Sequence, residues 1–210
     1  MVKQNKFCNF VSKIKIMNDE YCTITTPGEG YYTEKRSKFI SYACHIDSVE
    51  EAMEIVAKYK KKYFDARHVC YAYMSEPDGS IFRANDDGEP SSTAGKPILG
   101  QIQSHELTNV LCIVVRYYGG VNLGTGGLIV AYRTAAAEAI ENAGKETRLV
   151  EETIEYDFPY PMMNQVMRVV KEMQPRVVSQ TFDNTCSIRL SIRKTEAEQL
   201  RNRLAKLSFE

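Results

Sequence analysis

Short runs rich in aromatic and β-branched residues recur through the first half of the chain and predict β-strands. These runs lie at residues 21–25, 38–46, 69–74 and 80–84. The first two are separated by PGEG and the last two by EPDG, which are typical of turns because proline fixes one φ and glycine accepts a positive one. Residues 110–118 form an uninterrupted apolar run, which predicts a central strand buried on both faces of a sheet.

Helical periodicity appears in three segments between and after these strands. Residues 49–63 carry apolar side chains at helical spacing, and Ser48 with Glu51 fits a capping box. Residues 93–104 are expected to be helical although they contain Pro97, which a helix tolerates in its first turn. Residues 124–143 have one alanine-rich face, which we expect to pack closely on the sheet before Gly144 ends the helix.

The pattern changes near residue 150 and predicts a second domain. Alternating strands at 153–158, 176–182 and 186–193 are combined with helices near 163–173 and 195–207. The resulting order β-α-β-β-α matches a ferredoxin-like sandwich whose last strand is missing or reduced to residues 208–210, leaving an exposed sheet edge. The chain is therefore predicted to be α+β, with a leader or misassigned start at 1–16 and domains at 17–146 and 150–210.

The composition of the chain excludes several classes of function but does not point to a particular one. The 27 basic residues balance the 27 acidic ones, so binding to nucleic acid must use a local patch. No segment has the roughly 18–20 consecutive apolar residues of a membrane span, so no membrane association is expected. Six cysteines without a C-x-x-C spacing and three isolated histidines argue against a metal site, and they fit a reducing, cytoplasmic setting.

Asp86, Asp87 and Glu89 place three carboxylates within four residues of a Gly/Pro loop. Such a cluster can hold Mg²⁺ together with substrate phosphates, or serve as a general acid/base pair. Alternatively, Asp86 and Asp87 satisfy turn amides and Glu89 is solvated. His68, at the entry to a predicted strand, is a further catalytic candidate or a structural hydrogen-bonding residue.

Two predicted helix starts beside Arg116 suggest an anion-binding site, because the first amides of a helix are unpaired donors with partial positive charge. The loop at 119–127 has five glycines in nine residues but fits neither a P-loop nor a dinucleotide fingerprint. It can approach a ligand, form an amide nest, or simply allow tight strand-to-helix packing. The candidate anion-binding residues are Arg67, His68, Thr93, Ala94, Gly95, Arg116, Gly119, Gly120, Gly124, Thr125, Gly126 and Gly127.

Four ordered segments resemble the IMPACT/YigZ family: KRSKFI (35–40), RHVCYAY (67–73), DDGEPSSTAGKPIL (86–99) and VVRYYGGVNLGTGGLIVAY (114–132). The C-terminal part resembles, more weakly, the small domain of bacterial members and the late ferredoxin-like domains of elongation factor G. Ser92 occupies a position where many members carry glycine, so a positive φ is not expected there. The positions that match the family signature are Asp86, Asp87, Gly88, Glu89, Pro90, Thr93, Ala94, Gly95, Pro97, Arg116, Tyr117, Gly119, Gly120, Leu123, Gly124 and Gly127.

The resemblance implies a two-layer α/β N-terminal domain related to RNase PH and to the second domain of a small-subunit ribosomal protein. Eukaryotic members regulate translation initiation by competing for the activator of a stress-responsive initiation-factor kinase. The resemblance therefore favours a non-enzymatic regulator of translation that binds RNA, the ribosome or a translation factor through residues 86–97 and 119–127, without a cofactor. The alternative is a metal-assisted phosphoryl-transfer or hydrolytic enzyme that uses Asp86, Asp87 and Glu89, with Mg²⁺ as its cofactor.

Overall fold

The computed structural model describes residues 19–182 and 185–207, so the expected leader at 1–16 and the short strand at 208–210 lie outside the described residues. The chain divides into two compact units, of which the N-terminal one is Glu20–Val150 and the C-terminal one begins at Glu151 and includes Asp19. In the described part of the chain, no helix is both long and apolar enough to cross a membrane.

A five-stranded antiparallel sheet organises the N-terminal unit, in the order β2-β3-β6-β4-β5. The apolar run expected to form a central strand does so as β6, whose first six residues are all buried. The strands of this sheet are β2 (Gly28–Glu34), β3 (Ser37–His45), β4 (His68–Ser75), β5 (Ile81–Asn85) and β6 (Val110–Tyr117).

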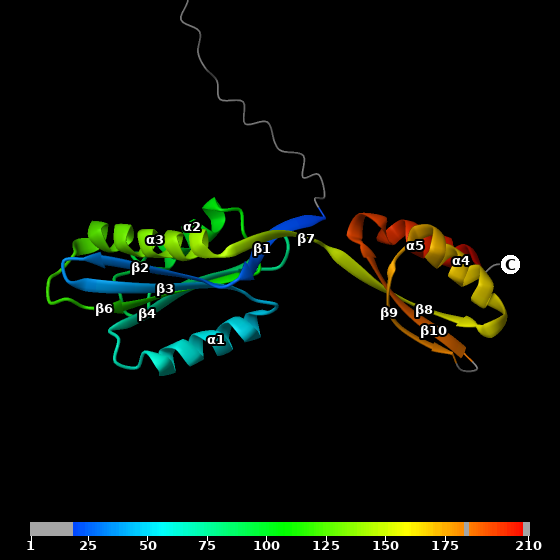
Figure 1. Ribbon diagram of the computed structural model, residues 1–210, viewed down its shortest axis with the longest axis horizontal. Coiled ribbons are helices and arrows are strands. Elements are labelled where there is room, and N and C mark those ends of the chain that lie inside the picture. Colours follow the sequence, from blue (N-terminus) through cyan, green and yellow to red (C-terminus); the bar gives the residue numbers. More distant parts are fainter. Residues whose placement is uncertain (1–18, 183–184, 208–210) are drawn as a thin grey trace, which may run out of the picture. The chain divides into compact units, whose positions relative to one another are not determined.

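Helices cover both faces of this sheet, as Figure 1 shows. Helix α1 (Val49–Lys62) packs on one face, while α2 (Gly95–Ser104) and α3 (Gly124–Asn142) pack on the other. The expectation of two layers was therefore wrong, and the unit has three. The physical reason lies in β6, where Leu111 and Ile113 face α1 while Cys112 and Val114 face α2 and α3, so neither face can be left in water.

Strand β2 was missed in the sequence, because PGEG was interpreted as a turn. The hairpin turn lies instead at Lys35 and Arg36, whose φ angles of 46° and 66° suit a two-residue connection between β2 and β3. The preceding strand, β1 (Glu20–Thr26), does not pair with β2 but with β7 (Gly144–Leu149), near the end of the unit.

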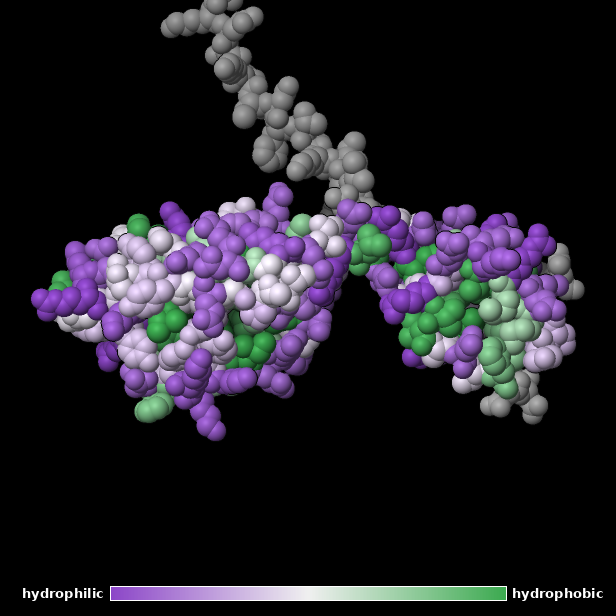
Figure 2. Space-filling view, in the orientation of Figure 1, coloured by the Kyte–Doolittle hydropathy of each residue, from purple (hydrophilic) through white to green (hydrophobic). Residues whose placement is uncertain are grey.

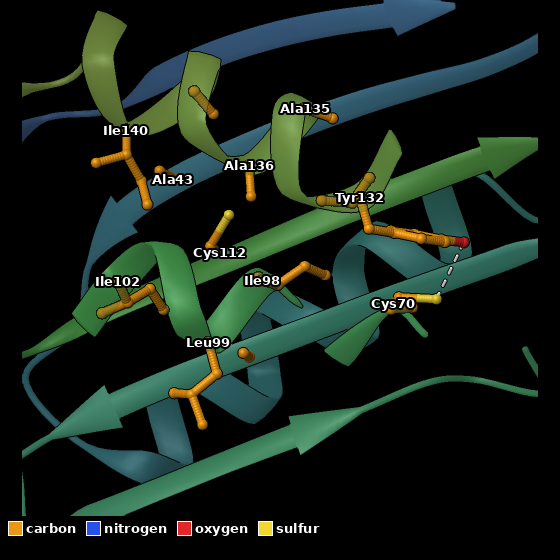
Figure 3. Close-up of a cluster of buried hydrophobic side chains, with 14 of the residues drawn as sticks. Ala43, Cys70, Ile98, Leu99, Ile102, Cys112, Tyr132, Ala135, Ala136 and Ile140 are labelled. Carbon is orange, nitrogen blue, oxygen red and sulfur yellow. Dashed lines mark hydrogen bonds between the residues drawn. The ribbon is translucent and has the colours of Figure 1, made fainter. Parts of the chain in front are cut away.

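The glycines of β2 are explained by the alanines of α3. A Cβ atom at Gly28 would lie 2.1 Å from the Ala139 carbonyl oxygen, and one at Gly30 would lie 2.7 Å from the Ala139 nitrogen. The close packing expected from the alanine-rich face is therefore confirmed, and glycine in the strand makes it possible. Figure 3 shows this core, in which Ala135 and Ala136 of α3 and Ile98 and Ile102 of α2 face the sheet.

The C-terminal unit contains the elements in the expected order β-α-β-β-α, with a short 3₁₀ turn η1 (Tyr160–Met162) added. Its antiparallel sheet has the order β8-β10-β9, and the two helices contribute Val166, Leu200 and Leu204 to its core. The elements are β8 (Glu151–Pro159), α4 (Met163–Met173), β9 (Arg176–Phe182), β10 (Thr185–Arg193) and α5 (Lys194–Leu207).

Strand β9 differs from its neighbours because all seven of its residues are exposed. Hydrophobic residues gather over β9 on the surface in Figure 2, and they include Val177, Val178 and Phe182. At this edge the sheet therefore presents apolar surface to solvent.

Candidate functional site

A cleft of about 710 Å³ opens at one end of the five-stranded sheet, where β4 begins, β6 ends and α3 starts. Both loops singled out in the sequence contribute to it. The acidic loop (86–92) contributes Glu89 and Pro90, and the glycine loop (119–127) contributes Gly124 and Thr125. The residues that line the cleft are Arg67, His68, Glu89, Pro90, Arg116, Tyr118, Asn122, Leu123, Gly124, Thr125 and Leu128.

Arg116, the next-to-last residue of β6, is the most unusual of the lining residues, because its side chain is only 6% exposed. Its guanidinium lies 5.5 Å from the ring centroids of both Phe39 and Tyr118, and Nη1 donates to Glu89 Oε1 at 2.5 Å. Its Nε is buried and lacks a hydrogen-bond partner among the described residues. A buried donor without a partner costs about 1–3 kcal/mol, and a water molecule or ligand that reached this nitrogen would offset that cost.

Glu89 is the centre of a polar network rather than a solvated loop residue as one interpretation of the sequence had it. Its side chain is 3% exposed, and Oε1 accepts hydrogen bonds from Arg116 Nη1 and from the Tyr132 hydroxyl at 2.8 Å. Burial, followed by the proximity of Cys70, raises the pKa of Tyr132, so its hydroxyl keeps its proton and donates to the carboxylate. The Cys70 thiol in turn donates a hydrogen bond to the Tyr132 hydroxyl oxygen at 3.3 Å, which the dashed line in Figure 3 marks.

His68 has a defined orientation at the cleft wall. Its Nδ1 lies 2.8 Å from the Asp87 carbonyl oxygen, which can only accept, so Nδ1 carries a proton. Its Nε2 lies 3.7 Å from Glu89 Oε1 and is the nitrogen left for a ligand. A neutral His68 therefore presents a hydrogen-bond acceptor at Nε2, and a protonated one presents a second donor.

Asp86 caps helix α2 from outside the helix. Its Oδ1 accepts from the Ala94 and Gly95 amides at 2.9 and 2.8 Å, and its Oδ2 accepts from the Ser92 amide at 2.9 Å. Burial raises the pKa of Asp86, but these amides, together with the charge of Lys96, outweigh it and the net pKa is lowered.

This capping corrects the expectation of an anion site at Thr93, Ala94 and Gly95. The amides of Ala94 and Gly95 already bind the carboxylate of Asp86, and Thr93 Oγ1 donates to the Pro90 carbonyl oxygen at 2.6 Å. The Thr93 amide also donates to the Pro90 carbonyl oxygen, so the amide donors of all three residues are used within the chain. None of the three lines the cleft.

Asp87 has separate partners, so the three carboxylates do not converge. Its Oδ2 accepts from the Val69 amide at 2.7 Å, and its Oδ1 lies 2.5 Å from Lys60 Nζ. Within residues 19–182 and 185–207, no group of three His, Cys, Asp or Glu side chains is placed to hold a metal ion. The satisfied-turn interpretation of Asp86 and Asp87 is the one that the hydrogen bonds support.

The glycines of the loop differ in their surroundings: Gly119 packs against backbone, and Gly124 lines the cleft. A Cβ atom at Gly119 would lie 2.2 Å from the Arg36 carbonyl carbon, so Gly119 permits contact with the β2–β3 turn. Gly124 lines the cleft at the start of α3 and has a φ of 71°, which favours glycine. The first amides of α3 have no intrahelical partner, and its N-cap makes no side-chain hydrogen bond. Of the candidate residues in the glycine loop, four do not line the cleft: Gly119, Gly120, Gly126 and Gly127.

Several residues of the site were not among the sequence candidates. Tyr132 looked like a core residue of an apolar helix face, and only the fold brings its hydroxyl to Glu89. Tyr118 lies two residues after Arg116 in the sequence. This short spacing could have indicated that its ring lies beside the Arg116 guanidinium in the site. Ser92 has a φ of 64°, contrary to expectation, because its amide must turn towards Asp86.

Comparisons with known proteins agree with this architecture and with these motifs. The family model described as the Impact N-terminal domain matches residues 35–140. An IMPACT family member of Haemophilus influenzae is 34% identical over 83% of this chain and 85% of its own length. The IMPACT family member YigZ of Escherichia coli is 32% identical over 83% of this chain and 86% of its own length.

A crystal structure described as that of a hypothetical protein is 28% identical and has a TM-score of 0.70. The match covers 90% of this chain and 93% of that one, so the similarity spans both units. The family model and the two curated relatives agree on one assignment: this chain belongs to the IMPACT family.

Proposed function

We propose that this protein is a non-enzymatic, cytosolic regulator of translation that binds RNA through the cleft at the end of its five-stranded sheet. The family assignment supports the translational role, since the resemblance to this family implies that its eukaryotic members regulate translation initiation. We also propose that the fold of the N-terminal unit is related to RNase PH and to the second domain of a small-subunit ribosomal protein. The C-terminal unit is ferredoxin-like, for which the strand order β8-β10-β9 is the supporting observation.

The observation that carries the proposal is the buried guanidinium of Arg116. Its Nε lacks a partner in the described part of the chain, and Arg116 lines the cleft together with Arg67 and the first residues of α3. Guanidinium groups and helix N-termini are both suited to phosphate oxygens. The cleft therefore offers a phosphate two or three convergent donors.

RNA is favoured over a small phosphorylated molecule by the aromatic surface beside these cations. Tyr118 is 46% exposed and lines the cleft next to Arg116. Bases of single-stranded RNA stack on such rings while their phosphates contact neighbouring cations. A single-stranded segment of RNA would use both features together.

Metal-assisted catalysis receives less support from the geometry. Asp86 and Asp87 are directed to backbone amides and to Lys60, and Glu89 is neutralised by Arg116. A Mg²⁺ ion would have to displace these partners before it could bind oxygen ligands from the cluster. The acidic loop is better explained as the scaffold of the cleft.

The proposal is tested by fluorescence anisotropy with a labelled single-stranded RNA dodecamer at several salt concentrations. Arg67 is exposed and lines the cleft, so Arg67→Ala should leave folding intact and weaken binding. Removing a cation that neutralises one phosphate should reduce the slope of log K against log[salt] by about 0.7. Arg116→Ala should weaken binding further, but it leaves Glu89 buried without its counter-ion and needs a parallel stability measurement.

Arg83→Ala is the matched control, because Arg83 is an exposed cation on β5 and does not line the cleft. Cosedimentation with ribosomes, before and after nuclease treatment, separates RNA-mediated binding from direct binding to a protein. The proposal fails if the wild-type protein shows no salt-sensitive affinity for the dodecamer or for ribosomal RNA. Turnover of the RNA by the wild-type protein would show catalysis and contradict the non-enzymatic role.

A further inference from the structure

A second hollow of about 380 Å³ lies between helices α2 and α3, apart from the cleft. Its wall contains two cationic side chains, Lys96 and Arg133, and no acidic one. We call this hollow the α2–α3 groove. The residues that line it are Ser92, Lys96, Pro97, Gly100, Gln101, Ile129 and Arg133.

The cleft and the α2–α3 groove are neighbours along helix α3. Thr125 lines the cleft, while Ile129 and Arg133 line the groove. These residues are four apart and therefore lie on one face of the helix. At 1.5 Å per residue, Thr125 and Arg133 are separated by about 12 Å along the axis. A single phosphate group is smaller than this separation, so one phosphate cannot occupy both hollows.

The acidic loop connects the same two hollows from the other side. Pro90 lines the cleft, and Ser92, two residues later, lines the groove. The left-handed conformation of Ser92, with a φ of 64°, lies at this junction. Residues 90–92 and residues 125–129 of α3 therefore each contribute to both hollows.

The two cations of the groove are available to a ligand. Lys96 and Arg133 are exposed, and neither forms an ion pair within 4.0 Å with any residue that the structure describes. Lys96 does lower the pKa of Asp86 through its charge, but the carboxylate of Asp86 is held by backbone amides. The Ser92 hydroxyl and the Gln101 amide add uncharged donors to the same wall.

We propose that the α2–α3 groove is a second phosphate subsite, so that cleft and groove together hold successive phosphates of one RNA strand. This inference rests on the proposed function, because it assigns the course of the bound RNA strand from the cleft to the groove. One phosphate lies at Arg116 and the start of α3, and a later one lies between Lys96 and Arg133. A strand that is too short to span both hollows occupies only the cleft.

The test compares a long and a short ligand on one variant. In Lys96→Ala/Arg133→Ala, the slope of log K against log[salt] for the RNA dodecamer should fall by about 0.7 for each phosphate that the variant no longer neutralises. The dissociation constant of adenosine monophosphate, measured from NMR shifts of cleft amides, should stay unchanged. The control, Lys58→Ala/Lys61→Ala, removes the same charge from exposed positions on α1, across the sheet, and should leave both measurements as in the wild type.

The outcomes separate the two proposals. If Arg67→Ala weakens dodecamer binding but Lys96→Ala/Arg133→Ala behaves like the α1 control, the groove proposal is overturned and the cleft proposal stands. If the wild-type protein does not bind the dodecamer, both are overturned. Equal binding of a polyglutamate peptide, with the same dependence on Lys96 and Arg133, would also overturn the assignment of the groove to phosphate.

Discussion

At the scale of single residues, the acidic loop owes its form to where each carboxylate finds its donors. Asp86 binds three backbone amides, Asp87 binds one amide and Lys60, and Glu89 binds Arg116 and Tyr132. Burial of an unpaired carboxylate is costly, so the partners of the buried Glu89 are needed for the folded loop, while those of the half-buried Asp86 and Asp87 stabilise it. Three similar side chains thus have three different structural roles.

Asp86→Asn should destabilise the N-terminal unit by about 0.5–2 kcal/mol at pH 7, because the amides at the start of α2 lose a charged acceptor. Since the pKa of Asp86 is lowered in the folded protein, its contribution is present above the ordinary pKa of 3.8 and is lost as pH falls through the folded value. Urea denaturation at pH 7 and at low pH checks this.

Asp157→Asn is the control for this measurement, because Asp157 is exposed on β8 of the other unit. Its effect should be close to zero at both pH values. An Asp86→Asn protein as stable as the wild type at pH 7 would mean that the cap has no energetic importance.

At the scale of elements, the contact between β2 and α3 decides the architecture of the N-terminal unit. The glycines of β2 let the helix backbone approach within a distance that any side chain would prevent. This contact holds α3 against the sheet, and the start of α3 forms one wall of the cleft. Packing at one end of the helix therefore positions the site at the other.

Gly30→Ala should destabilise the protein by about 1–3 kcal/mol, since its Cβ would lie 2.6 Å from Ser41 Oγ and 2.7 Å from the Ala139 nitrogen. Gly100→Ala is the matched control on α2, where a Cβ meets no atom within 4 Å. The control should be neutral or stabilising by up to about 1 kcal/mol, because alanine favours helix. Equal effects of the two substitutions on urea denaturation would refute the packing explanation.

At the scale of the whole molecule, each unit has its own hydrophobic core. The cores of the N-terminal unit include Leu111 and Ile140, and the core of the C-terminal unit includes Phe158 and Leu190, with no residue in common. A separate core is the condition for a domain that folds by itself. The two units should therefore respond separately to substitutions in their cores.

Leu190→Ala removes a fully buried side chain from the C-terminal core and should cost that unit about 2–5 kcal/mol. Hydrogen exchange followed by mass spectrometry should become faster in β8, β9 and β10 while β3, β4 and β6 keep their protection. Leu111→Ala, also fully buried, should give the reverse pattern. Faster exchange in both units after either substitution would show that they unfold together.

The sequence by itself determined most of the elements and the family, because these depend on local signals. The alternation in 153–158 and the apolar run at 110–118 led to β8 and β6, and the alanines of 124–143 indicated a closely packed helix. The family motifs lie in continuous segments, so they too could be found without a fold. The loops that form the cleft were identified in the same way.

Tertiary structure alone decided which groups meet. Strand β2 was missed because its glycines signal a turn locally and make sense only beneath α3. The expected anion site at Ala94 and Gly95 was wrong because Asp86, eight and nine residues earlier, folds back onto those amides. Arg116, Glu89 and Tyr132 converge from a strand, a loop and a helix, and no spacing in the sequence encodes that distance. A periodic pattern specifies a face of an element, whereas a site requires faces from several elements to be brought together.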